Sequence, residues 1–210
     1  MKIAKYNKIL KDRIGINLNS YQLFCGRYIN RDIIGKVQEY NSINQELVFE
    51  GEYLNGKRNG KGKEYNNKGQ LIFEGNYLIG KRNGKGKEYD EISDFIIYEE
   101  EYLNGKRNGK GKEYNHKGEL IFEGEYLNGY KWDGKLYGID NSVYELKDGK
   151  GLIKEYKFNE LTFEGELFNG QRNGKGKEYL GGRKIYEGEY LNGIRYNGKG
   201  YDPNNNIIYE

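Results

Sequence analysis

The chain has 210 residues, of which only 35% are hydrophobic, and a mean hydropathy of −1.02, so a conventional compact globule of this length would be short of core. Ala4 is the only alanine, and one proline and one methionine accompany 32 Gly, 22 Tyr and 8 Phe, which excludes a helical bundle and also an ordinary disordered polar chain. Charge is dense but balanced, with 35 Lys+Arg against 32 Asp+Glu, and a formal net charge of +3 does not by itself indicate nucleic-acid binding.

Residues 1–23 lack the pattern that fills the rest of the chain. They mix Lys, Ile and Leu, and we interpret them as a short helix, a cap or a frayed arm. No stretch resembles the apolar region of a leader or approaches the roughly 20 apolar residues of a spanning helix. Cys25 is the single cysteine and cannot form an intrachain disulfide, so a cytoplasmic location is the default expectation.

From about residue 24 onward the chain repeats one motif. The segment FEGEYLNGKRNGKGKEY runs from Phe49 to Tyr65 and returns nearly unchanged from Phe73, Tyr98 and Phe163. Weaker copies fill the gaps, so that units begin near residues 24, 49, 73, 98, 122, 144, 163 and 186. The unit that begins at Tyr144 has lost residues, and we expect an irregular bend there.

Within one unit, the residues alternate in character as a half-buried strand requires: Phe49, Gly51 and Tyr53 on one face, and Glu50, Glu52 and Leu54 on the other. Residues 55–60, NGKRNG, have turn chemistry, and residues 60–65 are predicted to form the return strand. Each unit is therefore predicted to be a β-hairpin. Residues 66–71, NNKGQL, would form a second turn into the next hairpin.

A single hairpin is barely stable in water, so the units must pair edge to edge and share an aromatic face. We predict an all-β fold, an elongated single-layer antiparallel β-sheet of about eight β-hairpins, continuous and with a right-handed twist. Residues 24–210 would form this array and residues 1–23 would lie outside it. Glycines such as Gly51, Gly60 and Gly62 are expected to let the backbone lie beneath the ring of a neighbouring unit.

The motif aromatic-E-G-E-aromatic-L-N-G-K-R-N-G-K-G resembles the MORN repeat family (membrane occupation and recognition nexus), and the resemblance covers roughly residues 24–210. It implies a rod-like single-layer antiparallel β structure with an aromatic-lined concave groove. It also implies scaffolding by protein-protein contact, sometimes dimerisation, and phospholipid association. Carried over position by position, the groove aromatics are Phe49, Tyr53, Phe73, Tyr77, Tyr98, Tyr102, Phe122, Tyr126, Tyr186 and Tyr190.

The chain departs from the family pattern in each unit. The family usually places an aromatic residue two positions after the last Gly of GxG, whereas here the residue is Glu64, Glu88, Glu113 or Glu178, with Tyr one position later. Either a bulge corrects the phase or the tyrosine leaves the groove face. In addition, Glu100 replaces an expected glycine and Leu167 an expected tyrosine.

Basic residues recur beside one turn of each unit. The segment GKRNGKGK is rich in glycine and lysine, but its spacing does not fit a phosphate-binding loop. The basic pairs are expected to line up along one edge, where they would either solubilise the sheet or contact anionic lipid or an acidic partner. They are Lys57, Arg58, Lys81, Arg82, Lys106 and Arg107.

No residue pattern indicates an active site or a metal site. His116 is the only histidine and lies in a predicted turn, so we expect no enzyme activity, cofactor, metal, nucleic acid or small-molecule substrate. Trp132 is the best single candidate for a partner hot spot, with local packing as the alternative.

The leading hypothesis is a non-catalytic cytoplasmic scaffold that binds a protein partner, or itself as a homodimer, through the aromatic groove. Its contact residues would include Tyr53, Tyr77, Tyr102 and Tyr126. The alternative is a membrane-peripheral adaptor that binds anionic phospholipid through the Lys/Arg edge.

Overall fold

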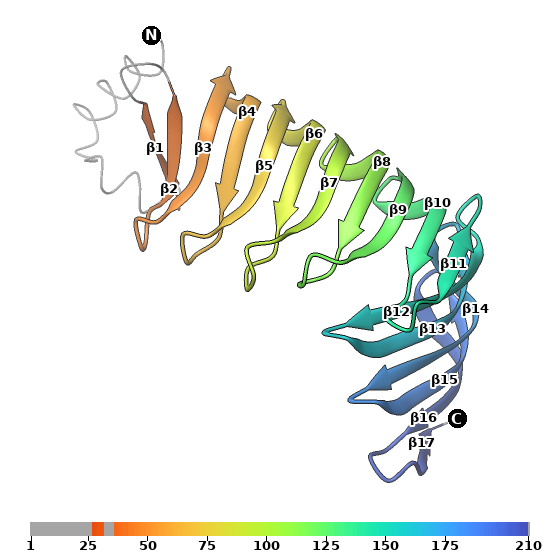
Figure 1. Cartoon of the computed structure of the whole chain (residues 1–210). Helices are drawn as coiled ribbons and strands as arrows, with labels where there is room; N and C mark the ends of the chain where they lie inside the picture. Colours follow the sequence, from red (N-terminus) through yellow and green to blue (C-terminus); the bar gives the residue numbers. More distant parts are fainter. Residues whose placement is uncertain (1–26, 32–35, 210) are drawn as a thin grey trace. The chain divides into compact units, whose positions relative to one another are not determined.

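The computed structural model describes residues 27–31 and 36–209, and within these ranges every regular element is a β-strand (Figure 1). This confirms the all-β antiparallel hairpin array. The chain divides into two compact units, residues 1–80 and 81–210, each of which is described by itself. The predicted arm at residues 1–23, Phe24 and Cys25 lie outside the described residues.

Unit 1 contains five antiparallel strands in chain order. They are β1 (Arg27–Arg31), β2 (Val37–Asn41), β3 (Leu47–Leu54), β4 (Lys57–Tyr65) and β5 (Leu71–Leu78).

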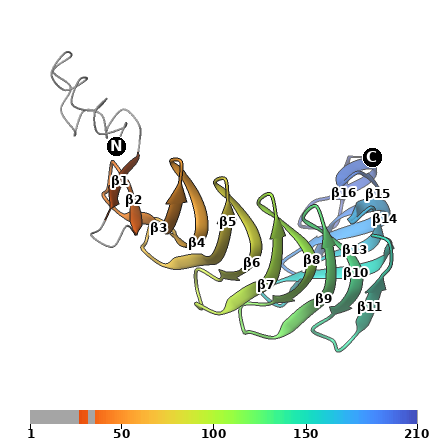
Figure 2. The same ribbon diagram turned by 90° about the horizontal axis from the view of Figure 1, so that it is seen from above.

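Unit 2 contains twelve strands, which also pair in chain order. Figure 2 shows the strands of these hairpins curving along their length. They are β6 (Lys81–Tyr89), β7 (Ile96–Leu103), β8 (Lys106–Tyr114), β9 (Leu120–Leu127), β10 (Tyr130–Tyr137), β11 (Val143–Leu146), β12 (Gly151–Lys157), β13 (Glu160–Phe168), β14 (Gln171–Leu180), β15 (Arg183–Leu191), β16 (Ile194–Tyr201) and β17 (Ile207–Tyr209).

The sheet of unit 2 breaks between β11 and β12. Strand β11 pairs with β10 and β12 pairs with β13, but only an isolated bridge, Lys147 to Lys150, lies between them. The prediction of one continuous sheet is therefore wrong at this corner, and the irregular bend expected in the unit that begins at Tyr144 is confirmed. The physical reason is length, because the shortened unit leaves β11 with four residues and no ladder to β12.

The hairpin turn is shorter than the sequence indicated. Asn55 and Gly56 have φ values of 50° and 77°, which suits a two-residue turn of type I′, and β4 begins directly after them at Lys57. The prediction of a turn over residues 55–60 is thus wrong, because Lys57 and Arg58 belong to the strand. The second Asn-Gly pair is Asn59 and Gly60. Gly60 has a φ of 88° and lies at a bulge in the β3–β4 pairing.

One face of the sheet, called the ring face here, carries the buried aromatic residues. Phe49 has no exposed surface, and its ring lies over the backbone of its own hairpin. A β-carbon on Gly62 would lie 2.3 Å from Cζ of Phe49 and 3.2 Å from Cε2 of Tyr77. The glycine therefore makes room mainly for the ring of its own hairpin, which corrects the expectation of a neighbouring ring. Gly60 differs, because a β-carbon there would meet the carboxylate of Glu52.

The opposite face, called the charged face here, carries lysine and glutamate in alternation from strand to strand. In unit 2 the register places Lys87 beside Glu99 and then Lys112 beside Glu123. Opposite charges on neighbouring strands support antiparallel pairing. The small net charge of the chain therefore results from lysines and glutamates that alternate in an ordered way from strand to strand.

Candidate interaction surfaces

Arginine on the ring face is stacked and ion-paired. In unit 2, Cζ of Arg107 lies 4.2 Å from the centre of the Tyr98 ring. Its guanidinium donates to Glu88 at 2.7 Å and to Glu113 at 2.9 Å, so it links two neighbouring hairpins. The hydroxyl of Tyr102 donates to Glu88 at 2.6 Å, which completes the cluster.

The same cluster occurs in unit 1. Cζ of Arg58 lies 4.2 Å above the Phe49 ring, and its guanidinium pairs with Glu39 at 2.9 Å and with Glu64 at 3.0 Å. The side chain of Arg58 is only 17% exposed. The predicted Lys/Arg edge is therefore divided: Lys57 is exposed at the turn, whereas Arg58 is built into the ring face.

The remaining basic residues of the predicted edge follow this division. Lys81 and Lys106 are exposed, whereas Arg82 and Arg107 are 24% and 21% exposed and pair with glutamates. Contact of these residues with anionic lipid or an acidic partner stays a prediction.

The environment of Glu113 on the ring face favours its ionised form. Burial alone would raise the pKa of Glu113, but Lys131 and Arg107 outweigh it and hold the pKa below the ordinary value of 4.5. Burial raises the pKa of Tyr53 to about 12, with a contribution from its hydrogen bond to Glu39. In each unit these side chains form a packed cluster of charge-assisted hydrogen bonds on the ring face. The buried hydrogen bonds and ion pairs of these clusters stabilise the sheet.

The predicted groove aromatics form the core of the sheet. Nine of the ten are at most 4% exposed, and only Tyr53 is half-buried. Neighbouring rings meet edge to face, as in Phe49 and Tyr77 with centroids 5.2 Å apart and Tyr98 and Tyr126 at the same separation. Their contact with a partner stays a prediction, and the open surfaces of the described residues lie elsewhere.

The glutamate that departs from the family pattern has a defined role. A bulge lies between Glu64 and Tyr65 in the β4–β5 pairing, and Tyr65 donates from the charged face to Glu50 at 3.0 Å. Tyr65 therefore leaves the ring face, and the bulge does not return it there. Glu64 takes the ring-face position and accepts from Tyr77 at 2.8 Å. In each full copy of the motif this glutamate follows an arginine by six residues, and this recurring pair is the signal in the sequence for the ring-face cluster.

Trp132 lies at the corner of unit 2. Its carbonyl accepts from the N–H of Gly149 at 2.8 Å, and a β-carbon on Gly149 would lie 2.8 Å from the indole. Gly149 in turn accepts from Gly170 at 2.8 Å, so the turns remain linked where the sheet ladder is broken. Trp132 therefore packs locally, and its role as a partner hot spot stays a prediction.

Exposed apolar side chains mark the ends of the hairpins. In unit 2, Leu103 is 48% exposed and lies one turn from the exposed Lys106, and neighbouring turns are hydrogen-bonded to one another. We call this set the turn row. Its apolar members are Leu54 and Leu78 in unit 1, and Leu103, Leu127, Phe168 and Leu191 in unit 2.

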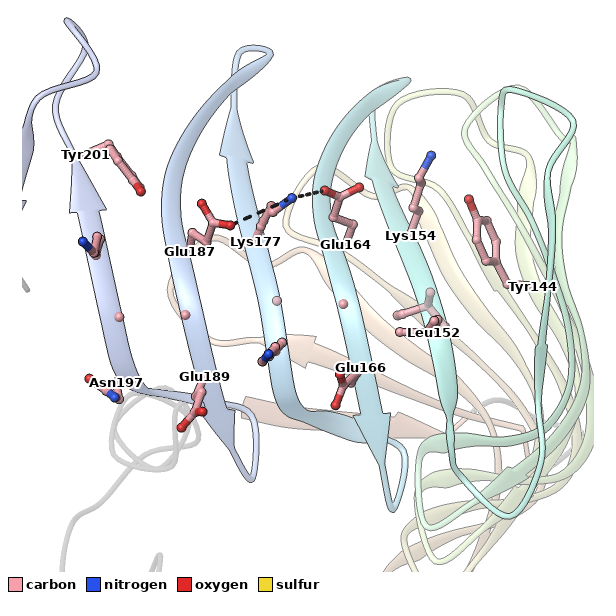
Figure 3. Close-up of a pocket in the computed structure, with 17 residues that line it drawn as sticks. Tyr144, Leu152, Lys154, Glu164, Glu166, Lys177, Glu187, Glu189, Asn197 and Tyr201 are labelled. Carbon is pink, nitrogen blue, oxygen red and sulfur yellow. Dashed lines mark ion pairs between the residues drawn. The ribbon is translucent and has the colours of Figure 1, made fainter.

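The largest hollow described lies on the charged face of unit 2. It has a volume of about 870 Å³ and crosses strands β12 to β16, with Tyr144 of β11 beside it (Figure 3). Its floor is glycine backbone: Gly165, Gly176, Gly188 and Gly198. Four lysines and four glutamates line it, so its formal charges balance, while apolar atoms supply the larger part of its exposed surface.

The groove has no arrangement typical of a metal or catalytic centre. Among the described residues, no three His, Cys, Asp or Glu side chains gather closely enough to hold a metal ion. Lys177 on β14 pairs with Glu164 at 3.4 Å and with Glu187 at 4.0 Å, which places opposite charges side by side across the floor. Such a surface suits recognition of a charged, extended partner.

An open antiparallel array of hairpins, each built on one aromatic and glycine motif, defines a β-hairpin repeat protein. The family model described as the MORN repeat matches residues 49–70, 73–92, 101–119 and 163–181. The chain is a MORN-repeat protein, with four matched repeats on the two sides of the corner. The comparison with curated proteins gave no match.

MORN repeats are interaction modules for proteins or membranes, and the family is a scaffold family that is not known for enzymatic activity. Proteins with these repeats are often cytoplasmic or membrane-associated. In the part of the chain that the structure describes, no helix has the length and apolar character needed to cross a membrane.

Proposed function

We propose that this chain is a non-catalytic scaffold that binds a protein partner through the groove on the charged face of β12–β16. The observation that carries the proposal is the groove itself, a hollow of about 870 Å³ on an otherwise open single-layer sheet. Its size lies within the range of roughly 300–1,000 Å³ that is typical of ligand sites. Its walls combine apolar surface with lysines and glutamates in equal number, which suits a peptide segment.

The packing of the ring face is consistent with a preformed groove on the opposite face of the sheet. The buried ring clusters fix the strands, and every second residue then projects to the charged face at a set spacing. A partner would therefore meet a preformed surface, which lowers the entropy lost on binding.

Selection from a displayed library of random dodecapeptides against the immobilised full chain tests the scaffold proposal. We expect enrichment of peptides that bind the wild type and lose at least ten-fold in affinity against Asn197→Trp, which fills one end of the groove with an exposed indole. Asn76→Trp on β5 is the matched control and should bind as the wild type does. Absence of enrichment, or full binding by the Asn197→Trp variant, would overturn the proposal.

A membrane-peripheral adaptor is the second candidate, and the turn row is the observation that favours it. At three turns a leucine that is 48–59% exposed stands beside an exposed lysine, a combination suited to the interface of an anionic bilayer. Homodimerisation through the same row is a third arrangement that the exposed leucines permit.

Co-sedimentation with vesicles tests the membrane candidate. Binding should rise when anionic lipid is added to neutral vesicles and fall at high salt, because exposed lysines supply the attraction. Leu103→Ser combined with Leu127→Ser should weaken it at least five-fold, whereas Asn197→Trp should not. Binding without dependence on anionic lipid or salt would exclude this candidate, and light scattering of the same samples reports dimer formation.

A further inference from the structure

Two rows of side chains line the groove, one on each side of the line of glycines that forms its floor (Figure 3). They are called the inner row and the outer row here. The register places the residues of one row side by side from β12 to β16, and those of the other row side by side except at β13–β14, where a bulge lies opposite Glu166. The inner row contains Lys154, Glu164, Lys177, Glu187 and Lys199. The outer row contains Leu152, Glu166, Lys175, Glu189 and Asn197.

The two rows differ in how their charges are satisfied. In the inner row, Lys177 pairs with the glutamate on each neighbouring strand. In the outer row, Glu166, Lys175 and Glu189 are exposed and, among the described residues, form no ion pair with another side chain. The outer row therefore offers the Lys175 ammonium and the Glu189 carboxylate on neighbouring strands, beside the exposed Glu166, whose carboxylate lies over the backbone at Gly174.

The spacing of these charges selects the conformation of the partner. Glu166 on β13 and Glu189 on β15 are two strands apart, which corresponds to about 9.6 Å across a sheet. A polyproline-II helix repeats every three residues, or about 9.3 Å. An extended strand presents the same side every 6.6–6.8 Å or so, and an α-helix places residues seven apart at about 10.5 Å. The polyproline-II repeat fits best.

The ends of the groove supply apolar contacts. Leu152 is 65% exposed at one end, and Tyr144 and Tyr201 line the groove at its two ends (Figure 3). Aromatic and apolar side chains are the usual contacts for proline rings in polyproline-II recognition. Five strands span about 19 Å, which accommodates roughly six residues at 3.1 Å per residue.

We propose that the groove binds a polyproline-II segment with a basic residue at every third position and an acidic residue within each repeat. The basic residues would pair with Glu166 and Glu189, and the acidic residue between them with Lys175. Proline would contact Leu152 and the tyrosines at the ends. This inference rests on the scaffold function proposed above and specifies its partner.

Two peptides of one composition test the inference. The first contains three Lys-Pro-Glu triplets, and the second groups the same residues as Lys-Lys-Lys-Pro-Pro-Pro-Glu-Glu-Glu. We expect the full chain to bind the fluorescein-labelled triplet peptide at least ten-fold more tightly than the grouped peptide, measured by fluorescence anisotropy at low salt. Equal affinity would overturn the proposal, because composition and net charge are identical.

Paired variants locate the site. Glu166→Gln with Glu189→Gln should weaken triplet-peptide binding at least ten-fold, with an unchanged circular dichroism spectrum and thermal unfolding midpoint. Glu101→Gln with Glu125→Gln is the matched control, because these glutamates occupy corresponding positions on β7 and β9, and the hollow that Glu125 lines is only about 280 Å³. The control should change affinity less than two-fold, and an equal loss in both pairs would contradict the groove assignment.

The outcome separates this inference from the scaffold proposal. If library selection yields groove-dependent peptides but the triplet peptide does not bind, the polyproline-II assignment is wrong and the scaffold proposal stands. If selection yields none and the triplet peptide does not bind, both are wrong.

Discussion

On the ring face, glycine is required because a β-carbon would collide with aromatic rings. In the turns, glycine is required because φ is positive. Gly176 has no space for a β-carbon, which would lie 2.7 Å from Cε2 of Phe163 and 3.0 Å from Cε2 of Tyr190. Gly193 has nothing within 4 Å of the same position but has a φ of 84°. The same residue type therefore performs two separate physical tasks in neighbouring hairpins.

Substitution at these two glycines should separate the tasks. Gly176→Ala is expected to lower the free energy of unfolding by about 2–4 kcal/mol, because two buried rings must move. Gly193→Ala should cost only about 1 kcal/mol, from the left-handed backbone alone. Urea unfolding followed by tyrosine fluorescence measures both, and equal losses would contradict the contact between Gly176 and the rings.

Glu100 has a backbone conformation that favours glycine, and substitution can relieve this strain. It stands where other hairpins have glycine, has a φ of 124°, and lies 3.6 Å from Lys85 across an exposed ion pair. We expect Glu100→Gly to raise the free energy of unfolding by about 1 kcal/mol, because relief of backbone strain exceeds the small value of the ion pair.

The control for this prediction is Glu123→Gly, at an exposed position of β9. It should lower stability by about 0.5–1 kcal/mol, the usual cost of glycine in a strand. Calorimetry that gave both variants the same sign would show that strain at Glu100 is unimportant.

At the scale of the elements, hairpins are joined by more than the backbone ladder. Glu113 on β8 pairs with Arg107 of its own hairpin and with Lys131 of the next, and Tyr126 of that hairpin also donates to it at 3.3 Å. Each ring-face glutamate thus connects one hairpin to its neighbour. Residues that are invariant in position along an array couple adjacent repeats in this way.

The stabilisation that Glu113 gives by joining two hairpins should decrease at acid pH. The folded-state pKa of Glu113 is lowered below 4.5, so its stabilisation is present above pH 4.5 and is lost as the pH falls through the folded-state value. Glu113→Gln should lower the free energy of unfolding at pH 7 by about 2–4 kcal/mol, because Arg107 and Lys131 lose their charged partner. It should also flatten the decline of stability below pH 4.5.

Glu123→Gln is the control for acid dependence, since the Glu123 side chain is 48% exposed and pairs only with Lys112 in the described part of unit 2. It should change stability at pH 7 by less than about 0.5 kcal/mol, because an exposed ion pair contributes little. A profile of Glu113→Gln that matched the wild type would contradict the role of this carboxylate.

At the scale of the whole molecule, tyrosine replaces the aliphatic core that the composition lacks. Rings on the ring face are buried in both units, and hydroxyls on both faces donate to glutamates. Burial, with hydrogen bonds to glutamate, raises the pKa of Tyr65, Tyr114 and Tyr179 to about 12. The molecule therefore carries many neutral phenols that resist ionisation only while it is folded.

Stability should consequently fall at alkaline pH. A folded-state pKa raised above the ordinary value of 10.0 means that this stabilisation is present below pH 10 and is lost as the pH rises toward 12. Absorbance titration at 295 nm should show a group of tyrosines ionising near pH 10 and a second group only near 12 or on unfolding. A single transition near pH 10 would contradict the buried phenols.

The sequence by itself determined the hairpin array. The period of two, the aromatic and glycine order and the recurring Asn-Gly turn are local signals, and local signals specify strands and turns. They also located the bend, because the loss of residues in the unit that begins at Tyr144 is visible in the spacing. The family followed from the same motif.

The tertiary structure decided which side chains are available. Lys57 and Arg58 are neighbours in sequence, yet the strand directs them to opposite environments, and this depends on where the turn ends. Glu39 and Glu64 meet Arg58 only after three strands have paired, and the groove exists only where the glycine backbones of β13–β16 lie side by side. Such contacts depend on register between strands, which is a property of the assembled sheet and not of any one segment.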